Sequence, residues 1–149
     1  MLLKSVVIVM AVIIVALFGV LIFYNPAHAP VVPPGAQPML SADGKLAVAS
    51  LHDGDLVASP LTITGQVTGG GWFNEASFPV KIADGDGRII GTGVAQAQSD
   101  WMSTSSVPFT AIINFKTPRY ATGTVLLSKD NPSGLPANDA TLSIPVRFK

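Results

Sequence analysis

Apolar side chains run without interruption through residues 5–24, a stretch with no charged residue, no Asn, no Gln and no Pro. A helix of about 20 residues rises about 30 Å, which matches the hydrocarbon thickness of a bilayer. Because backbone groups in lipid must be satisfied within their own segment, the pattern predicts one membrane-spanning helix. Residues 1–24 are therefore expected to form an N-terminal transmembrane signal anchor.

The charges around this segment predict its orientation. Lys4 lies directly before the span, whereas the next basic residue after it is Lys45. Since positive residues near a span stay in the cytoplasm, we expect a cytoplasmic N-terminus and an extracytoplasmic C-terminal domain. A cleaved signal peptide is the alternative, because residues 27–29 have the small-x-small form of a cleavage site. The long apolar run and Pro30 at the first mature position favour an uncleaved anchor.

Prolines dominate the next stretch. Residues 25–40 contain five of them, at positions 26, 30, 33, 34 and 38, and no Lys, Arg, Asp or Glu. Proline-rich segments favour the extended polyproline II conformation. Residues 25–45 are therefore expected to form an extracytoplasmic linker that enters a folded domain at residues 46–149.

Within residues 46–149, apolar and polar positions alternate with a period of two. Leu142, Ile144 and Val146, for example, alternate with polar or proline neighbours. The pattern predicts seven strands, and runs rich in Gly, Pro, Asp and Ser separate them as turns. The expected strands cover residues 46–51, 61–67, 78–82, 88–98, 107–115, 122–129 and 142–148. Short strands at this spacing predict an all-β fold, an antiparallel immunoglobulin-like two-sheet sandwich.

The amino-acid composition indicates which cellular compartment and which classes of partner are compatible with this chain. The chain has no cysteine, which excludes disulfides and a lipoprotein anchor and is compatible with the bacterial cell envelope. The formal net charge is zero and charged residues make up only 12% of the chain. Without a basic stripe, neither nucleic acid nor a polybasic contact with lipid is expected.

Residues that could support catalysis or bind a metal are scarce. The two histidines, His28 and His52, lie in the linker and in a turn, and no Gly-x-Ser-x-Gly motif occurs. Asp84 and Asp86 resemble the start of a calcium loop, but Arg88 stands at the next ligand position. A hairpin turn explains these residues better. We therefore expect no catalytic residues, no cofactor and no metal.

One group of polar and aromatic residues remains as a candidate binding surface. Loops alternate between the two ends of an antiparallel sandwich, so loops 68–75, 99–106 and 130–140 are expected at one end, called here the Trp pole. The linker is expected to enter at the same end. Either the aromatic side chains plug the core, or they form a binding surface. The candidate residues are Trp72, Phe73, Asn74, Glu75, Asp100, Trp101, Met102, Asp130, Asn131, Ser133, Asn138 and Asp139.

Two long stretches carry a resemblance to a known family. Residues 72–82 (WFNEASFPVKI) and 130–148 (DNPSGLPANDATLSIPVRF), with Asp100-Trp101-Met102 between them, resemble the bacterial immunoglobulin-like domain associated with spore germination, the second type of Gmad domain. The resemblance covers roughly residues 46–148. It implies an extracytoplasmic sandwich, often tethered to a membrane.

These observations lead to one functional expectation and two alternatives. The chain is expected to be a non-catalytic, membrane-anchored extracytoplasmic module that mediates protein interaction or assembly in the bacterial cell envelope. The first alternative is a module that binds cell-wall glycan or other carbohydrate by stacking sugar rings on Trp72 and Trp101, which requires exposed tryptophans. The second is a hydrolase that uses Glu75 and Asp100 as a carboxylate pair in a deep cleft.

Overall fold

The computed structural model describes residues 37–149. The expected membrane span and most of the expected linker lie outside this range, so the structure does not bear on the anchor or on its orientation. Between residues 37 and 149, no helix is long and apolar enough to cross a membrane.

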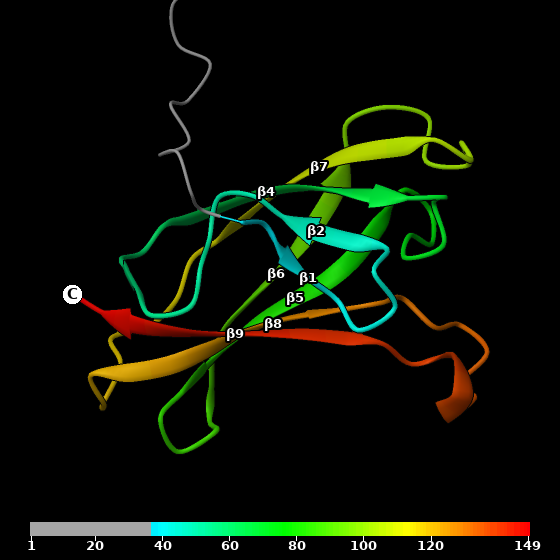
Figure 1. Cartoon of the computed structure of the whole chain (residues 1–149). Helices are drawn as coiled ribbons and strands as arrows, with labels where there is room; N and C mark the ends of the chain where they lie inside the picture. The colour runs from blue at the N-terminus through cyan, green and yellow to red at the C-terminus, as the bar shows by residue number, and fades with distance from the viewer. Residues whose placement is uncertain (1–36) are drawn as a thin grey trace, which may run out of the picture. The chain divides into compact units, whose positions relative to one another are not determined.

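The described part of the chain is all-β, with nine strands and one short 3₁₀ helix (Figure 1). All seven expected strands are present, and two short ones, β1 and β3, are additional. The strands are β1 (Met39–Leu40), β2 (Leu46–Val48), β3 (Asp55–Val57), β4 (Leu61–Thr68), β5 (Ser77–Asp84), β6 (Ile89–Ala97), β7 (Ser106–Ile113), β8 (Thr122–Ser128) and β9 (Thr141–Phe148), and the 3₁₀ helix is Pro136–Asn138.

Hydrogen bonds join the nine strands into one continuous sheet in the order β1-β2-β4-β7-β6-β5-β8-β9-β3. Every pairing is antiparallel except that of β3 with β9. In Figure 1, β2, β4 and β7 lie above β8 and β9, so the sheet folds over on itself. The mostly antiparallel all-β fold is confirmed, but the two expected sheets are joined where Ala95–Ala97 pair with Phe109–Ala111.

The core fills the space between the two layers. Alternate residues of β7 and β9 are buried, as the period-two pattern predicts. The rings of Phe78 in β5 and Phe109 in β7 lie 5.1 Å apart, although these strands are not neighbours in the sheet, so the contact crosses the core. Each such side chain contributes about 1.5–3 kcal/mol when it is fully buried. Apolar packing therefore holds this cysteine-free domain together.

The chain enters the domain from a different end than expected. Residues 39–45 of the expected linker belong to the folded domain, where they form β1 and a tight turn. Since β1 runs antiparallel to β2, it runs toward the Trp pole rather than starting there. The expected entry at that pole is therefore wrong. The hydroxyl oxygen of buried Ser41 accepts a hydrogen bond from the Leu46 N–H (3.0 Å), which fixes this reversal.

The other additional strand, β3, joins the opposite layer. The chain leaves β2, crosses over at residues 49–54, and pairs Asp55–Val57 parallel with the end of β9. Gly54 donates its N–H to the carbonyl of Pro145 (2.9 Å) where the crossing ends. The N-terminal part of the domain therefore borders both layers.

Candidate functional site

The three loops of the Trp pole lie together at one end of the domain. Thr68 pairs with Ser106 at the ends of β4 and β7, and the Gly69 N–H donates to the Ser105 carbonyl (3.1 Å). The Asp130 N–H donates to the carbonyl of Trp72 (3.1 Å), which joins the third loop to the first. Sequence reasoning thus groups these loops as the structure does.

Trp72 and Phe73 do not lie on the surface of this end. Trp72 is fully buried and Phe73 is 6% exposed. Both rings contact Phe78, with centroid distances of 5.9 Å and 5.4 Å. Gly70 allows this inward fold, because a Cβ at that position would lie 2.2 Å from the carbonyl oxygen of Trp101. The aromatic rings of Trp72 and Phe73 therefore close the end of the core, which is the first of the two alternatives given for them.

A hydrogen bond from its indole holds Trp72 in place. Nε1 donates to Oδ2 of Asp43 (3.0 Å), and Oδ1 of Asp43 accepts from the Lys45 N–H (3.1 Å) and from the Ser41 hydroxyl. Burial raises the pKa of Asp43, but hydrogen bonds from Ser41, Lys45 and Trp72 outweigh this and hold the pKa below its usual value. The sequence does not reveal this contact because 29 residues separate the partners.

Other candidate residues remain accessible around this plug. Met102 is 73% exposed, and Oδ1 of Asp100 accepts its N–H (3.1 Å) in a tight turn. Trp101 is half-buried and packs against the core. Glu75 is exposed at the tip of a two-residue turn between Asn74 and Ser77, where both backbone pairs are made (2.9 and 3.0 Å). Glu75, Asp100 and Met102 can therefore contact a partner.

The polar residues of the β8–β9 loop mostly contact each other. Asn131 Nδ2 donates to Asp139 Oδ1 (2.7 Å) and to the carbonyl of Leu135 (2.9 Å). Asn138 Nδ2 donates to the Ser133 hydroxyl (3.0 Å). These bonds shape the loop and leave Leu135 59% exposed.

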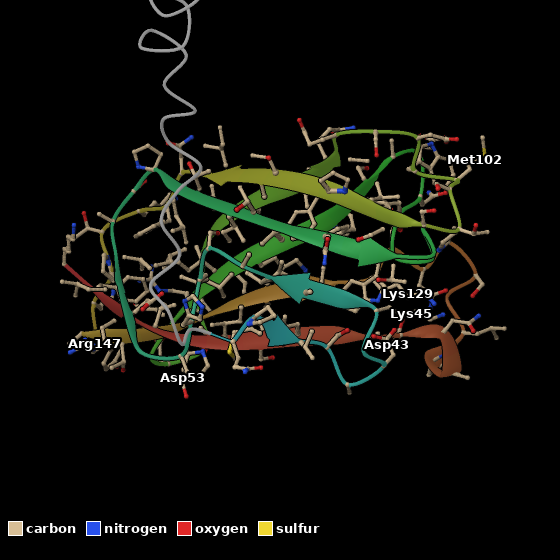
Figure 2. All side chains as sticks on the ribbon, turned by 45° about the horizontal axis from the view of Figure 1, so that its top comes forward. Asp43, Lys45, Asp53, Met102, Lys129 and Arg147 are labelled. Carbon is tan, nitrogen blue, oxygen red and sulfur yellow. The ribbon has the colours of Figure 1, made fainter. Side chains whose placement is uncertain are left out.

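Charges of both signs border the pole. Figure 2 shows Asp43, Lys45, Lys129 and Met102 at one end of the domain, with Arg147 toward the other. Among residues 37–149, no group of three side chains is placed to hold a metal ion. The described histidine, His52, has its Nδ1 3.5 Å from Asp55 Oδ2.

The comparison with protein families gives one match. The model of the family described as "Immunoglobulin-like domain of bacterial spore germination", Gmad2, matches residues 46–134. The chain belongs to the Gmad2 family. The matched region begins with β2 and ends inside the β8–β9 loop, so it contains most of the Trp pole. No curated protein and no solved structure matches the chain.

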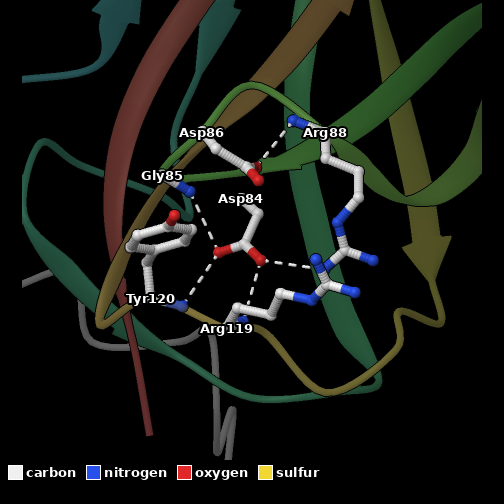
Figure 3. A network of polar contacts seen from close by, with 6 residues as sticks. All are labelled: Asp84, Gly85, Asp86, Arg88, Arg119 and Tyr120. Carbon is white, nitrogen blue, oxygen red and sulfur yellow. Dashed lines mark hydrogen bonds and ion pairs between the residues drawn. The ribbon is translucent and has the colours of Figure 1, made fainter.

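At the other end of the Gmad2 domain, a buried carboxylate joins two loops (Figure 3). Oδ1 of Asp84 accepts the N–H groups of Gly85 (3.0 Å) and Tyr120 (3.2 Å). Oδ2 accepts the Arg119 N–H (2.8 Å) and the Arg88 guanidinium (3.0 Å). The β5–β6 turn is thereby fastened to the segment before β8.

These bonds also determine how Asp84 ionises. Burial raises the pKa of Asp84, but the backbone N–H groups of Arg119 and Gly85, the Arg88 guanidinium and the Tyr120 N–H together hold the pKa below its usual value. The carboxyl group is fully satisfied and fully buried, so it is a structural element of the Gmad2 domain. The sequence alone assigns Asp84 only to a hairpin turn. Its further role is not visible there, because its partners Arg119 and Tyr120 lie 35 and 36 residues away.

Proposed function

We propose that this protein is a non-catalytic, membrane-anchored, extracytoplasmic module that binds another protein of the bacterial cell envelope through the Trp pole. The observation that carries the proposal is the exposure of two large apolar side chains there, Met102 at 73% and Leu135 at 59%. They belong to the loops on either side of the β4–β5 loop. Burying such a side chain contributes about 1.5–3 kcal/mol, and buried apolar anchors dominate protein interfaces.

The arrangement around the two side chains supports a protein partner. Glu75 and Asp100 are exposed on the same pole, so an apolar centre is accompanied by charged groups. Protein interfaces commonly have such an apolar centre and a polar rim. The buried plug of Trp72 and Phe73 gives these loops a rigid base. Anchoring in the membrane rests on the apolar run at residues 5–24.

The two alternative functions have less support at this pole. The burial of Trp72 counts against stacking of a sugar on its ring, and Trp101 is half-buried. A hydrolase that uses Glu75 and Asp100 would need a cleft between them. Neither the groove beside Phe115 and Phe148 nor the groove beside Thr124 and Pro145 is lined by these two residues.

Site-specific photo-crosslinking in native membranes tests the proposal. Met102 or Leu135 is replaced by benzoyl-phenylalanine in the full-length protein, and crosslinked products are identified by mass spectrometry. Ile112 is the matched control, since it is 60% exposed but lies in β7 away from the pole. We expect one protein to be captured from positions 102 and 135 but not from 112. Equal capture from all three positions, or none from the first two, would contradict the proposal.

The membrane anchor has its own test. Extraction of the membranes at alkaline pH should leave the full-length protein in the pellet, and protease added outside the cytoplasmic membrane should degrade its C-terminal domain. Release into the soluble fraction, or protection from the protease, would contradict the anchored extracytoplasmic topology.

A further inference from the structure

Three neighbouring strands, β4, β7 and β6, contain no charged residue. Their sequences are LTITGQVT, SVPFTAII and IIGTGVAQA, and β7 pairs with the other two. Alternate side chains of these strands point away from the core, and they are exposed or half-buried. We call this outward surface the neutral face. Its residues are Thr62, Thr64, Gln66, Thr92, Val94, Gln96, Pro108, Thr110 and Ile112.

The largest apolar side chains of the neutral face lie on adjacent strands. Val94 in β6 is 53% exposed and Ile112 in β7 is 60% exposed. They come directly before and after Ala95 and Ala111, which pair with each other in the β6–β7 ladder. The strands stay close beyond this pair, because a Cβ on Gly93 would lie 3.1 Å from the carbonyl oxygen of Ile112. Val94 and Ile112 therefore form one apolar patch on the neutral face.

Charged residues border the neutral face but do not belong to it. Lys81 lies in β5, which pairs with β6. The Lys45 carbonyl accepts the Thr68 N–H (2.8 Å) at the end of β4, and the Lys116 N–H donates to the Ile90 carbonyl (3.0 Å) near the start of β6. A two-fold interface places a surface against its own copy, where like charges would repel. The neutral face avoids this repulsion because it carries no charge.

We propose that the neutral face packs against the neutral face of a second copy of this protein, an inference that rests on the membrane anchoring proposed above. Six of its nine side chains are β-branched, so they lose little freedom when they are covered. Three strands about 27 Å long and about 4.8 Å apart present about 400 Å² per copy, or about 800 Å² in the pair. Stable interfaces bury at least about 1,200 Å², so the pair is weak and depends on tethering both copies to one membrane.

Other occupants of the neutral face have less support. A glycan would find no aromatic ring to stack on among the nine outward side chains. A strongly charged partner would find no opposite charge among them. None of the nine residues belongs to the three loops of the Trp pole, so the two contacts can form independently.

Single-cysteine variants of the full-length protein in liposomes test the proposal, since the chain has no cysteine of its own. Thr110→Cys is placed within the neutral face, because Thr110 pairs with Thr64 on one side and with Gln96 on the other. Ser143→Cys, at an exposed position on β9, is the matched control. With a bismaleimide reagent, we expect Thr110→Cys to form about tenfold more crosslinked dimer than Ser143→Cys.

Charges introduced on the neutral face should separate the two copies. Ile112→Glu or Ile112→Lys, added to Thr110→Cys, puts like charges on both copies and should lower the yield of dimer about tenfold. A mixture of the Glu and Lys variants should restore the yield. Thermal melting shows whether each variant is folded, and Thr62→Glu, at the exposed residue paired with Ile112, replaces a variant that is not.

Equal yields of dimer from Thr110→Cys and Ser143→Cys overturn the proposal. An unchanged yield in folded Ile112→Glu, or a mixture no better than either of its components, overturns it as well. Alkaline extraction of the liposomes shows that each variant is still anchored, so failure of the neutral face and failure of the anchor are distinguishable. Crosslinks between two copies contain this chain alone, so they are also distinct from a partner captured at Met102.

Discussion

The tip of the β4–β5 loop stores backbone strain that a double substitution should relieve. Glu75 and Ala76 have φ angles of 48° and 63°, and are the non-glycine residues with positive φ among those described. They occupy the two central positions of a two-residue hairpin turn of type I′, which favours Asn-Gly. Each L-residue in this conformation costs about 1–2 kcal/mol.

The expected gain from Glu75→Asn with Ala76→Gly follows from these costs. Glycine removes the strain at position 76 but makes the unfolded chain more flexible, which costs about 0.5–1 kcal/mol. Asparagine tolerates the left-handed region and relieves part of the strain at position 75. The net stabilisation is about 1–2 kcal/mol, which corresponds to a rise in Tm of about 4–8 °C for a domain of this size.

Thermal and denaturant unfolding, followed by the fluorescence of buried Trp72, would measure this gain. Ala42→Gly is the matched control, because Ala42 is exposed in a turn and lacks a positive φ. It should lower stability by about 0.5–1 kcal/mol. If the Asn-Gly variant melts at or below the temperature of the unaltered protein, the turn is not strained as argued.

Two further substitutions test the packing and the buried carboxylate. Gly123→Ala should destabilise the domain by about 1–3 kcal/mol in urea unfolding, because the new Cβ would lie 2.3 Å from the Ala83 carbonyl oxygen. Gly71→Ala, whose Cβ would meet nothing closer than 3.9 Å, should change stability little, and equal effects would refute the steric argument. The pKa of Asp84 is lower in the folded protein than its value of 3.8 in the unfolded chain. Asp84 therefore contributes stability at pH values above 3.8, and this contribution is lost as the pH falls through the lower pKa of the folded state. The Asp84→Asn variant should therefore be less stable than the unaltered protein at neutral pH, and its free energy of unfolding should fall less steeply as the pH is lowered. Asp53→Asn, at an exposed position, is the control and should show neither effect.

The longer strands could be predicted from sequence because their alternation is regular. Eight-residue strands such as β7 and β9 bury every second residue, and a period of two is visible over that length. With two and three residues, β1 and β3 are too short to show a period. The strand β1 forms because it pairs with β2, and β3 forms because it pairs with β9. Neither pairing can be predicted from the local sequence.

The candidate site was predicted in position but not in burial. Loop order alone places Trp72 and Met102 at the same end, since antiparallel strands alternate in direction. Which aromatic side chain turns inward depends on distant groups, such as Asp43 for Trp72. The role of Asp84 was missed for the same reason, because its partners Arg119 and Tyr120 lie 35 and 36 residues later in the chain.

The parallel pairing of β3 with β9 has a consequence for how the chain acquires its structure as it leaves the ribosome or a translocation channel. The paired residues are about 90 positions apart in the chain, as for Asp55 and Val146. Synthesis proceeds from the N-terminus, so β3 emerges long before its partner exists. This edge of the domain can close only after nearly the whole chain has appeared. Until then β3 has no strand to pair with, and a chaperone that binds unpaired extended segments would find it exposed.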